Sequence, residues 1–247
     1  MVVPARSCRA CVCVPLTGHA AEVGRAARID ADQVVLDLRS VPVRCKTDVI
    51  RLAVADAVNS LPWAAPTVAV QLNDSGTRWF QEDIVQLVML VGSGVDRVIV
   101  PDVREPAQVL AAAQLLDEIE HEFPVERPIR IEARIGSARG VVNADVIAAA
   151  SPRLDAVIFD CDDYARSLGI SPFDQIDDVV DQWSYARSRI ANAGYAADLA
   201  VIDGPSHVLS GVPDRSRAAA LRARAAGYTG KWTMNPAEVE LFRTLFK

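Results

Sequence analysis

The chain has 247 residues, of which 51% are hydrophobic and 23% are charged, and its net charge is −6. These values exclude a disordered polypeptide and are ordinary for one large globular domain or two small ones. The sequence has no apolar run of the roughly 18 residues that a membrane span needs, no basic block typical of nucleic-acid binding, and no long apolar core of a secretory signal near the N-terminus. We therefore expect a cytoplasmic protein whose partners include neither a membrane nor a nucleic acid.

In chain order, short apolar runs rich in Val and Ile alternate with longer stretches that carry apolar residues at three- and four-residue spacing. The short runs predict strands, and the longer stretches, such as residues 49–58 and 109–119, predict helices. The predicted strands are residues 10–14, 33–38, 67–72, 97–100, 129–135, 156–159, 199–202 and 231–234.

This alternation predicts a parallel sheet covered by helices, and therefore an α/β protein. Eight strand-and-helix units in about 250 residues match a (β/α)8 TIM barrel, which we expect as a single domain over residues 1–247. A doubly wound open sheet is the alternative, but no G-x-G-x-x-G motif follows the first strand. The irregular stretch 169–178 precedes a helix predicted at residues 179–193 and is a candidate loop over the site.

The chemistry of such a barrel lies at the carboxyl ends of its strands. The polar residues at these positions are Asp37, Arg39, Gln71, Asn73, Asp102, Arg104, Asp160, Asp162, Asp163, Asp203 and Asn235. Any single Asp or Asn among them can simply cap the following helix. The stretch DAVIFDCDDYARS, however, places three carboxylates close together, and nearby carboxylates repel one another unless a cation or a proton lies between them. A metal site is therefore the first hypothesis for Asp160, Asp162 and Asp163.

Cysteines and histidines give weaker signals. Cys8, Cys11 and Cys13 are close in sequence, but no second Cys or Cys/His pair with zinc spacing follows, so we expect buried thiols rather than a metal site. The total of five cysteines is odd, which argues against a disulfide framework. His207 lies near the predicted carboxyl end of the barrel, and we interpret it as a surface loop residue, with a general base as the alternative.

Several motifs occur in the order typical of one enzyme family. They are RACVCVP, VVLDLRSV, QLNDSGTRWFQEDI, VIVPDVRE, the stretch from Val141 to Gly169, VIDGP and GYTGKWTMNPAEVELFRTLF. Together they resemble the HpcH/HpaI aldolase superfamily, which includes the citrate lyase β-subunit and the malyl-CoA lyases. The resemblance implies a Mg²⁺-dependent barrel that cleaves or forms a carbon–carbon bond between a CoA thioester enolate and an oxo acid. It also implies a trimer-based homo-oligomer.

Some residues of the family pattern are present and others are replaced. The family's metal-binding Asp falls on Asp163, and an arginine that contacts the substrate in relatives falls on Arg9. The second metal ligand, a Glu, falls on Gly136. The GKW motif around Lys231 is a packing motif of the family. The other replaced positions are Arg39 and Ser40 in place of an acidic pair, Gln71 in place of Arg, Asp102 in place of Lys, and Asn235 in place of His. We expect no counterpart of the C-terminal segment that the resemblance implies as a lid in malyl-CoA lyases.

We therefore expect a carbon–carbon lyase of aldol type with an altered active site, acting on a small carboxylate or acyl-thioester substrate. The expected Mg²⁺ ligand is Asp163, joined by Asp160 or Asp162. We do not expect Glu132 to join them, because it comes four residues before Gly136 and so lies about 13 Å further than Gly136 from the carboxyl end of the barrel. The expected catalytic residues are Arg9, Asp37, Arg39 and Asp163. The expected substrate-binding residues are Arg9, Gln71, Asn73, Asp102, Arg134, Asp203 and Asn235.

Three alternatives stay open. The chain is an ordinary metal-dependent lyase with rearranged ligands, a barrel that runs metal-free chemistry on another small molecule, or a non-catalytic binding or partner protein. The metal-free alternative would use Arg39, Arg134, Asp102 and Asp160. Since the replaced residues all lie at strand ends while the packing motifs are retained, the pattern favours a changed function over general decay.

Overall fold

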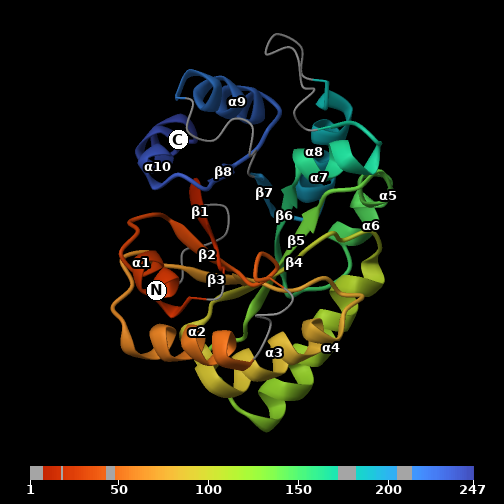
Figure 1. The fold of residues 1–247 in the computed structure, drawn as a ribbon. Coiled ribbons are helices and arrows are strands. Elements are labelled where there is room, and N and C mark those ends of the chain that lie inside the picture. Colours follow the sequence, from red (N-terminus) through yellow and green to blue (C-terminus); the bar gives the residue numbers. More distant parts are fainter. Residues whose placement is uncertain (1–7, 18, 43–47, 172–181, 205–212) are drawn as a thin grey trace.

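The computed structural model describes residues 8–17, 19–42, 48–171, 182–204 and 213–247. Its strands form a closed barrel in chain order, and every neighbouring pair is parallel, including β8 with β1 (Figure 1). The strands are β1 (Ala10–Pro15), β2 (Gln33–Asp37), β3 (Val68–Gln71), β4 (Arg97–Val100), β5 (Arg130–Ile135), β6 (Leu154–Phe159), β7 (Ala200–Asp203) and β8 (Gly230–Thr233). The predicted (β/α)8 TIM barrel is confirmed.

Helices cover the outside of the barrel, and α2, α3 and α4 lie side by side along one flank (Figure 1). The α-helices are α1 (Ala20–Ala26), α2 (Asp48–Ser60), α3 (Arg78–Val91), α4 (Pro106–Glu122), α5 (Ala138–Val142), α6 (Ala144–Ala148), α7 (Cys161–Ser167), α8 (Ser184–Ala196), α9 (Pro213–Ala225) and α10 (Val239–Leu245). Among the described residues, η3 (Gly92–Gly94) and η5 (Pro236–Glu238) are short 3-10 helices. Within the described ranges, none of the helices combines the length and the apolar character that crossing a lipid bilayer requires.

All predicted strands overlap the observed strands, with differences of at most two residues at each end. The helix predicted at 179–193 is instead α8, which begins at Ser184 and continues to Ala196. This helix contains Gly194, and a glycine is needed there because the position packs against β7. A Cβ at Gly194 would stand only 2.5 Å from Val201 Cγ2. The candidate loop 169–178 lies outside the described residues from residue 172 onward.

Side chains along each strand alternate between the barrel interior and the helix layer. The thiols of Cys8, Cys11 and Cys13 belong to the interior cluster, next to Trp232. Burial raises the pKa of Cys8 to about 12 and raises those of Cys11 and Cys13 well above the usual value. The predicted burial of these thiols is confirmed.

The lower part of the interior, near the amino ends of the strands, contains a buried ion pair. Glu132 of β5 lies 3.5 Å from Arg97 Nε of β4 and accepts a hydrogen bond of 3.1 Å from Gln33 Nε2. Burial raises the pKa of Glu132 even though Arg97 opposes the shift. Glu132 therefore serves this lower pair, in agreement with the expectation that it does not reach the carboxyl end.

Candidate active site

A chain of hydrogen bonds crosses the carboxyl end of the barrel, which we call the mouth. Gln71, the last residue of β3, donates from Nε2 to Asp37 Oδ1 at 2.7 Å. Its Oε1 accepts from Nη1 of Arg134 in β5 at 2.8 Å, and Nη2 of the same arginine donates to Asp160. All four side chains are buried. Residues from β2, β3, β5 and the end of β6 are thus joined in one layer.

A second layer lies above the first and is partly exposed. Arg39 follows β2, and its Nη1 donates to Oδ2 of Asp163 in α7 at 2.9 Å. Arg134 Nη2 lies 3.6 Å from the same oxygen, and Arg166 donates to the other oxygen, Oδ1. Because β2 and β6 lie on opposite sides of the ring, Arg39 reaches across the mouth. Its Nε is also 3.0 Å from Asp74 Oδ1.

Local capping explains how two of these carboxylates are held. Asp160 is the N-cap of α7, and its Oδ1 accepts from the backbone N–H of Asp163 at 2.8 Å. Asp37 accepts from the backbone N–H of Arg39 at 2.9 Å and from the hydroxyl of Ser40. The Asp160 side chain therefore both caps α7 and takes part in the ionic network.

The two central carboxylates have opposite electrostatic surroundings. Burial raises the pKa of Asp160, although Arg134 acts in the other direction. Burial also opposes ionisation of Asp163, but Arg134, Arg166 and Arg39 outweigh it and hold the pKa of Asp163 below its ordinary value. Asp163 is therefore a carboxylate at neutral pH and the partner of converging guanidinium groups.

These residues do not fit a magnesium ion. Each oxygen of Asp160 and Asp163 already accepts a hydrogen bond, from Arg134 and the Asp163 backbone in the first case and from Arg39 and Arg166 in the second. A Cβ at Gly136, where the second ligand was expected, would stand 2.7 Å from Asp163 Cβ and 3.3 Å from Asp160 Cβ. Mg²⁺ demands near-octahedral oxygen ligands, and no group of three metal-binding side chains occurs among the described residues. The expected ligand set of Asp163 with Asp160 stays a prediction, and in this structure arginines neutralise both carboxylates.

Asp162, the other expected ligand, contacts Cys161. Its side chain is buried, with Oδ1 3.7 Å from Cys161 Sγ. Burial and the charge of Asp162 raise the pKa of this thiol, and Arg187 and Asp203 also act on it. These neighbours belong to the layer between the barrel and α8, and we therefore do not retain Asp162 as a ligand at the mouth.

Asp203 also lies in that layer. It follows Ile202, which points into the barrel interior, so its own side chain points outward. There it accepts hydrogen bonds from Arg187 of α8 and Lys231 of β8. The expectation that Asp203 binds substrate is therefore corrected. Lys231, to which the sequence analysis gave only a packing role, is part of a buried ionic cluster.

Arg9 lies at the other end of the barrel. The backbone N–H groups of Arg9 and Ala10 donate to Asp32 Oδ2 at 2.9 and 3.0 Å, and Arg9 Nη1 is 3.5 Å from the Arg243 carbonyl oxygen. Arg9 precedes β1, so the six residues of that strand, about 20 Å at 3.3 Å per residue, separate it from the mouth. This placement corrects the expectation that Arg9 contacts the substrate.

The other expected substrate-binding residues lie at the rim. Asn73 donates to Asp83 Oδ2 from its backbone and its side chain, at 2.9 and 2.8 Å. Asp102 has a positive φ of 46° and pairs with Arg104 at 2.6 Å. Asn235 caps η5. His207 lies outside the described residues. The mouth therefore unites Asp37, Arg39, Gln71, Arg134, Asp160 and Asp163 from the expected set.

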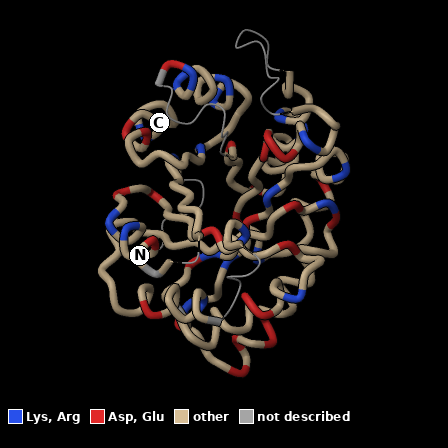
Figure 2. Tube along the Cα trace, viewed as in Figure 1, with Lys and Arg blue, Asp and Glu red and all other residues tan. Residues whose placement is uncertain are grey.

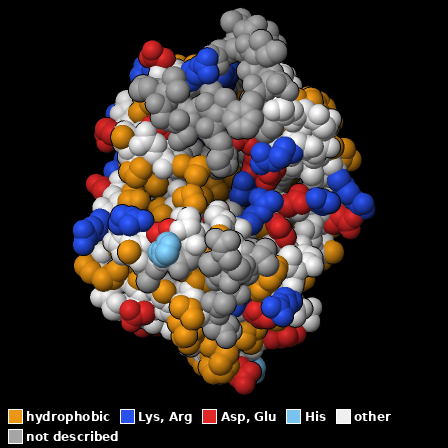
Figure 3. All heavy atoms as spheres, in the orientation of Figure 1, with side chains coloured by type: hydrophobic (Ala, Val, Ile, Leu, Met, Phe, Trp, Pro, Cys, Tyr) orange, Lys and Arg blue, Asp and Glu red, His pale blue; other side chains and the backbone are white. Residues whose placement is uncertain are grey.

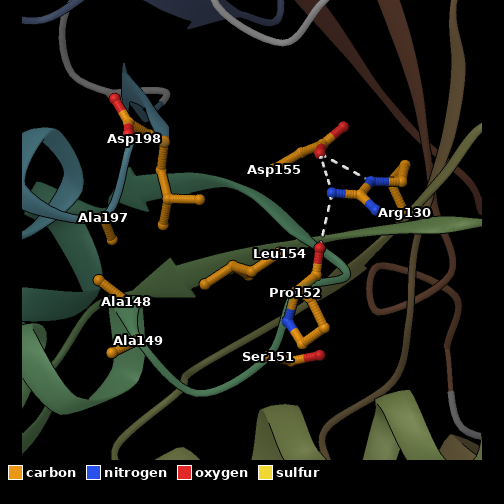
Figure 4. Close-up of a pocket in the computed structure, with 10 residues that line it drawn as sticks. Arg130, Ala148, Ala149, Ser151, Pro152, Leu154, Asp155, Ala197 and Asp198 are labelled. Atoms are coloured by element: carbon orange, nitrogen blue, oxygen red, sulfur yellow. Dashed lines mark hydrogen bonds and ion pairs between the residues drawn. The ribbon is translucent and has the colours of Figure 1, made fainter.

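Surface concavities are also present among the described residues, and one of them adjoins the mouth through Asp74. That one, of about 590 Å³, runs beside the rim and includes Asp74, Asp102 and Arg104. A second, of about 660 Å³, lies at the amino ends of β5 and β6, where Arg130 donates to Asp155 and to the carbonyl oxygen of Pro152 (Figure 4). Since barrel chemistry belongs to the carboxyl ends, the second pocket is not the candidate active site.

Charge is finely mixed in the described part of the molecule. Basic and acidic residues are both scattered along the trace, and on the visible face basic and acidic side chains lie next to one another (Figures 2 and 3). Such mixing is what the arginine–carboxylate pairs at the mouth require, and it contrasts with the continuous basic surface of a typical nucleic-acid-binding protein.

Comparisons with known proteins agree with the fold. The L-malyl-CoA/beta-methylmalyl-CoA lyase of Cereibacter sphaeroides is 30% identical over 229 residues, which cover 87% of this chain and 72% of that protein. The citrate lyase subunit beta of Leuconostoc mesenteroides is 27% identical over 219 residues, covering 87% and 69%. A structure of the Mycobacterium tuberculosis citrate lyase beta subunit, complexed with oxaloacetate and magnesium, matches with a TM-score of 0.78 and 23% identity, over 99% of this chain and 100% of that one.

The family assignment rests on a match to a family sequence model over most of the chain. The sequence model of the HpcH/HpaI aldolase/citrate lyase family matches residues 10–236, which span the barrel from β1 to the start of η5. The chain therefore belongs to the HpcH/HpaI aldolase/citrate lyase family.

Proposed function

We propose that the chain is a carbon–carbon lyase of aldol type that acts on a small carboxylate or acyl-thioester substrate at the mouth. One observation carries this proposal: the guanidinium groups of Arg39 and Arg134 converge on a single carboxylate oxygen, Asp163 Oδ2, at 2.9 and 3.6 Å. Guanidinium groups bind carboxylates through charge-assisted hydrogen bonds, so the same pair suits the carboxylate of a substrate. The relatives named above are lyases, which supports the reaction class.

The two arginines have different roles in this proposal. Arg134 is buried and fixed between Gln71 and Asp160, and it forms the permanent base of the anion site. The Arg39 side chain is 30% exposed and its partner Asp163 is 16% exposed, so this pair is the one that can open. An incoming carboxylate takes the place of Asp163 beside Arg39 and keeps both guanidinium groups neutralised.

The chemistry needs no oxidant or reductant. In aldol cleavage the substrate hydroxyl gives its proton to solvent and becomes a carbonyl, while the bond between the carbinol carbon and the adjacent carbon breaks. The electron pair of that bond moves into an enolate, which then takes up a proton at carbon. Arg134 and Arg39 are placed to stabilise negative charge as it develops on the oxygens of such a substrate.

Two further residues position Arg134. Asp37 holds the Gln71 amide at 2.7 Å, and that amide in turn accepts from Arg134. Both act on the substrate only through the arginine. The carboxylates of Asp160 and Asp163 are engaged by arginines in this proposal.

A direct assay tests the proposal. The full chain is incubated with malyl-CoA, beta-methylmalyl-CoA or citramalyl-CoA, and the thioester and oxo-acid products are separated and quantified. We expect turnover above a no-enzyme control and its loss in Arg134→Gln. Binding of a carboxylate ligand without turnover would instead favour the non-catalytic alternative, which the complete pairing of Asp160 and Asp163 also supports.

A further inference from the structure

We infer that the Arg39 guanidinium takes the place of the divalent cation that the family resemblance implies beside Asp163, so that the mouth is electrostatically complete without a metal. The inference rests on the geometry of the mouth and does not depend on the proposed lyase activity. It explains why Asp163 is retained although its expected partner ligand is absent.

The first argument is the arrangement of charges. Asp160 and Asp163 bring two negative charges to adjoining positions, and Arg134 contacts both. Arg39 supplies a second positive charge directly on Asp163 Oδ2 at 2.9 Å. Where the family pattern has an acidic pair, Arg39 and Ser40 raise the local positive charge. The guanidinium is always protonated, so this charge is permanent.

The second argument is space. Asp163 lies so close to Gly136 that a Cβ on the glycine would stand 2.7 Å from Asp163 Cβ, a separation that real Cβ contacts do not show. The close approach of α7 to the end of β5 therefore requires glycine at position 136, where the family pattern has Glu. A site rebuilt in this way differs from a metal site that has merely lost a ligand.

The third argument is that Arg39 is held in place at several points. Its backbone N–H donates to Asp37 at 2.9 Å, its Nε lies 3.0 Å from Asp74, and its Nη1 reaches Asp163. These contacts fix a cation across the mouth. A magnesium ion would have to shed water and displace this arginine to reach the same carboxylate.

Metal titration tests the inference with a readout independent of activity. Mn²⁺ is titrated into the full chain and followed by calorimetry and by the electron paramagnetic resonance signal of free Mn²⁺. We expect no saturable binding at millimolar Mn²⁺ in the natural protein. In Arg39→Glu, which restores an acidic residue and removes the Arg39 hydrogen bond to Asp163 Oδ2, we expect the affinity to rise by about tenfold or more.

A matched control separates this local effect from a general change of charge. Arg104→Glu makes the same substitution at another arginine near the mouth, one that pairs with Asp102 and is 57% exposed. It should leave Mn²⁺ binding unchanged, and adding Asp163→Asn to Arg39→Glu should remove the acquired binding. Circular dichroism and thermal unfolding establish that each variant is folded.

Two results would overturn the inference. Saturable binding of Mn²⁺ to the natural protein that Asp163→Asn abolishes would show that Arg39 does not occupy the cation's place. A folded Arg39→Glu variant with no gain over the Arg104→Glu control would show that Arg39 is not what excludes the ion.

Discussion

Two ionic clusters in this barrel contain the same kinds of side chain but differ in how far solvent reaches them. In the helix layer, Asp203 lies between Arg187 and Lys231, and all three are almost completely shielded from solvent. At the mouth, Asp163 lies between Arg39 and Arg134, but Arg39 retains 30% of its exposure. A closed cluster can only stabilise the fold, whereas an open one can exchange a partner for a ligand. The accessibility of one arginine, rather than the number of charges, separates the two.

The largest expected effect is on the closed cluster. Asp203→Ala leaves Arg187 and Lys231 as buried charges without their shared carboxylate, so we expect the free energy of unfolding to fall by about 3–5 kcal/mol. Urea denaturation followed by circular dichroism measures the change. Asp102→Ala, which removes a rim carboxylate, serves as the control and should cost less than about 1 kcal/mol. Equal losses in the two variants would contradict the distinction between the clusters.

Substitutions in the open cluster at the mouth should change the catalytic activity. Arg134→Gln removes the fixed guanidinium, and we expect kcat/KM on an accepted thioester substrate to fall by about 100- to 1,000-fold. Arg39→Gln should act mainly on KM, because its partner is the exchangeable one. Steady-state kinetics on both variants, with unfolding curves as the control for folding, makes the measurement. An unchanged kcat/KM in folded Arg134→Gln would remove this arginine from the mechanism.

A smaller effect is expected where α7 meets β5. Gly136→Ala puts a Cβ 2.7 Å from Asp163 Cβ, so we expect overpacking to lower the free energy of unfolding by about 1–3 kcal/mol. Gly24→Ala is the matched control, since nothing lies within 4 Å of a Cβ there. Chemical denaturation of the pair measures the difference. A Gly136→Ala protein as stable as the control would show that the helix can withdraw freely.

The smallest effect is a pH dependence of the closed cluster. Arg187 and Lys231 lower the pKa of Asp203 against the opposing effect of burial, so its folded-state pKa lies below its unfolded value. The stability that this carboxylate contributes is then fully present above about pH 4 and is lost as the pH falls through the folded-state pKa. The stability difference between the natural protein and Asp203→Asn should therefore shrink on acidification. A difference that stays constant or grows from pH 6 to pH 3 would contradict this sign.

The sequence contains the fold more completely than the site. Strands such as residues 97–100 were predicted at their observed bounds because short apolar runs between turn residues report burial directly. The helix α7 was missed because its first residues, Cys161 to Asp163, read as an acidic strand end. Its capping by Asp160 is a local signal that could have revealed it.

The sequence predicted several residues of the site, but it did not predict which arginine pairs with which carboxylate. Arg39, Arg134 and Asp160, proposed for a metal-free alternative, do meet at the mouth, and Asp102 does not join them. Asp203 and Arg9 were misplaced for different reasons. The side chain of Asp203 points away from the barrel interior because side chains alternate along a strand. Arg9 comes before β1 and therefore lies at the amino end of the barrel. Which arginine reaches which carboxylate depends on contacts between residues more than 100 positions apart, such as Arg39 with Asp163, and no local pattern encodes them.

The most direct test of an arginine-based mouth is the metal dependence of turnover. Cleavage of an accepted acyl-thioester substrate is measured with the full chain in excess EDTA and again in excess Mg²⁺. We predict the same rate in both conditions. A rate that disappears in EDTA and returns when Mg²⁺ is added would contradict the replacement of the cation by Arg39.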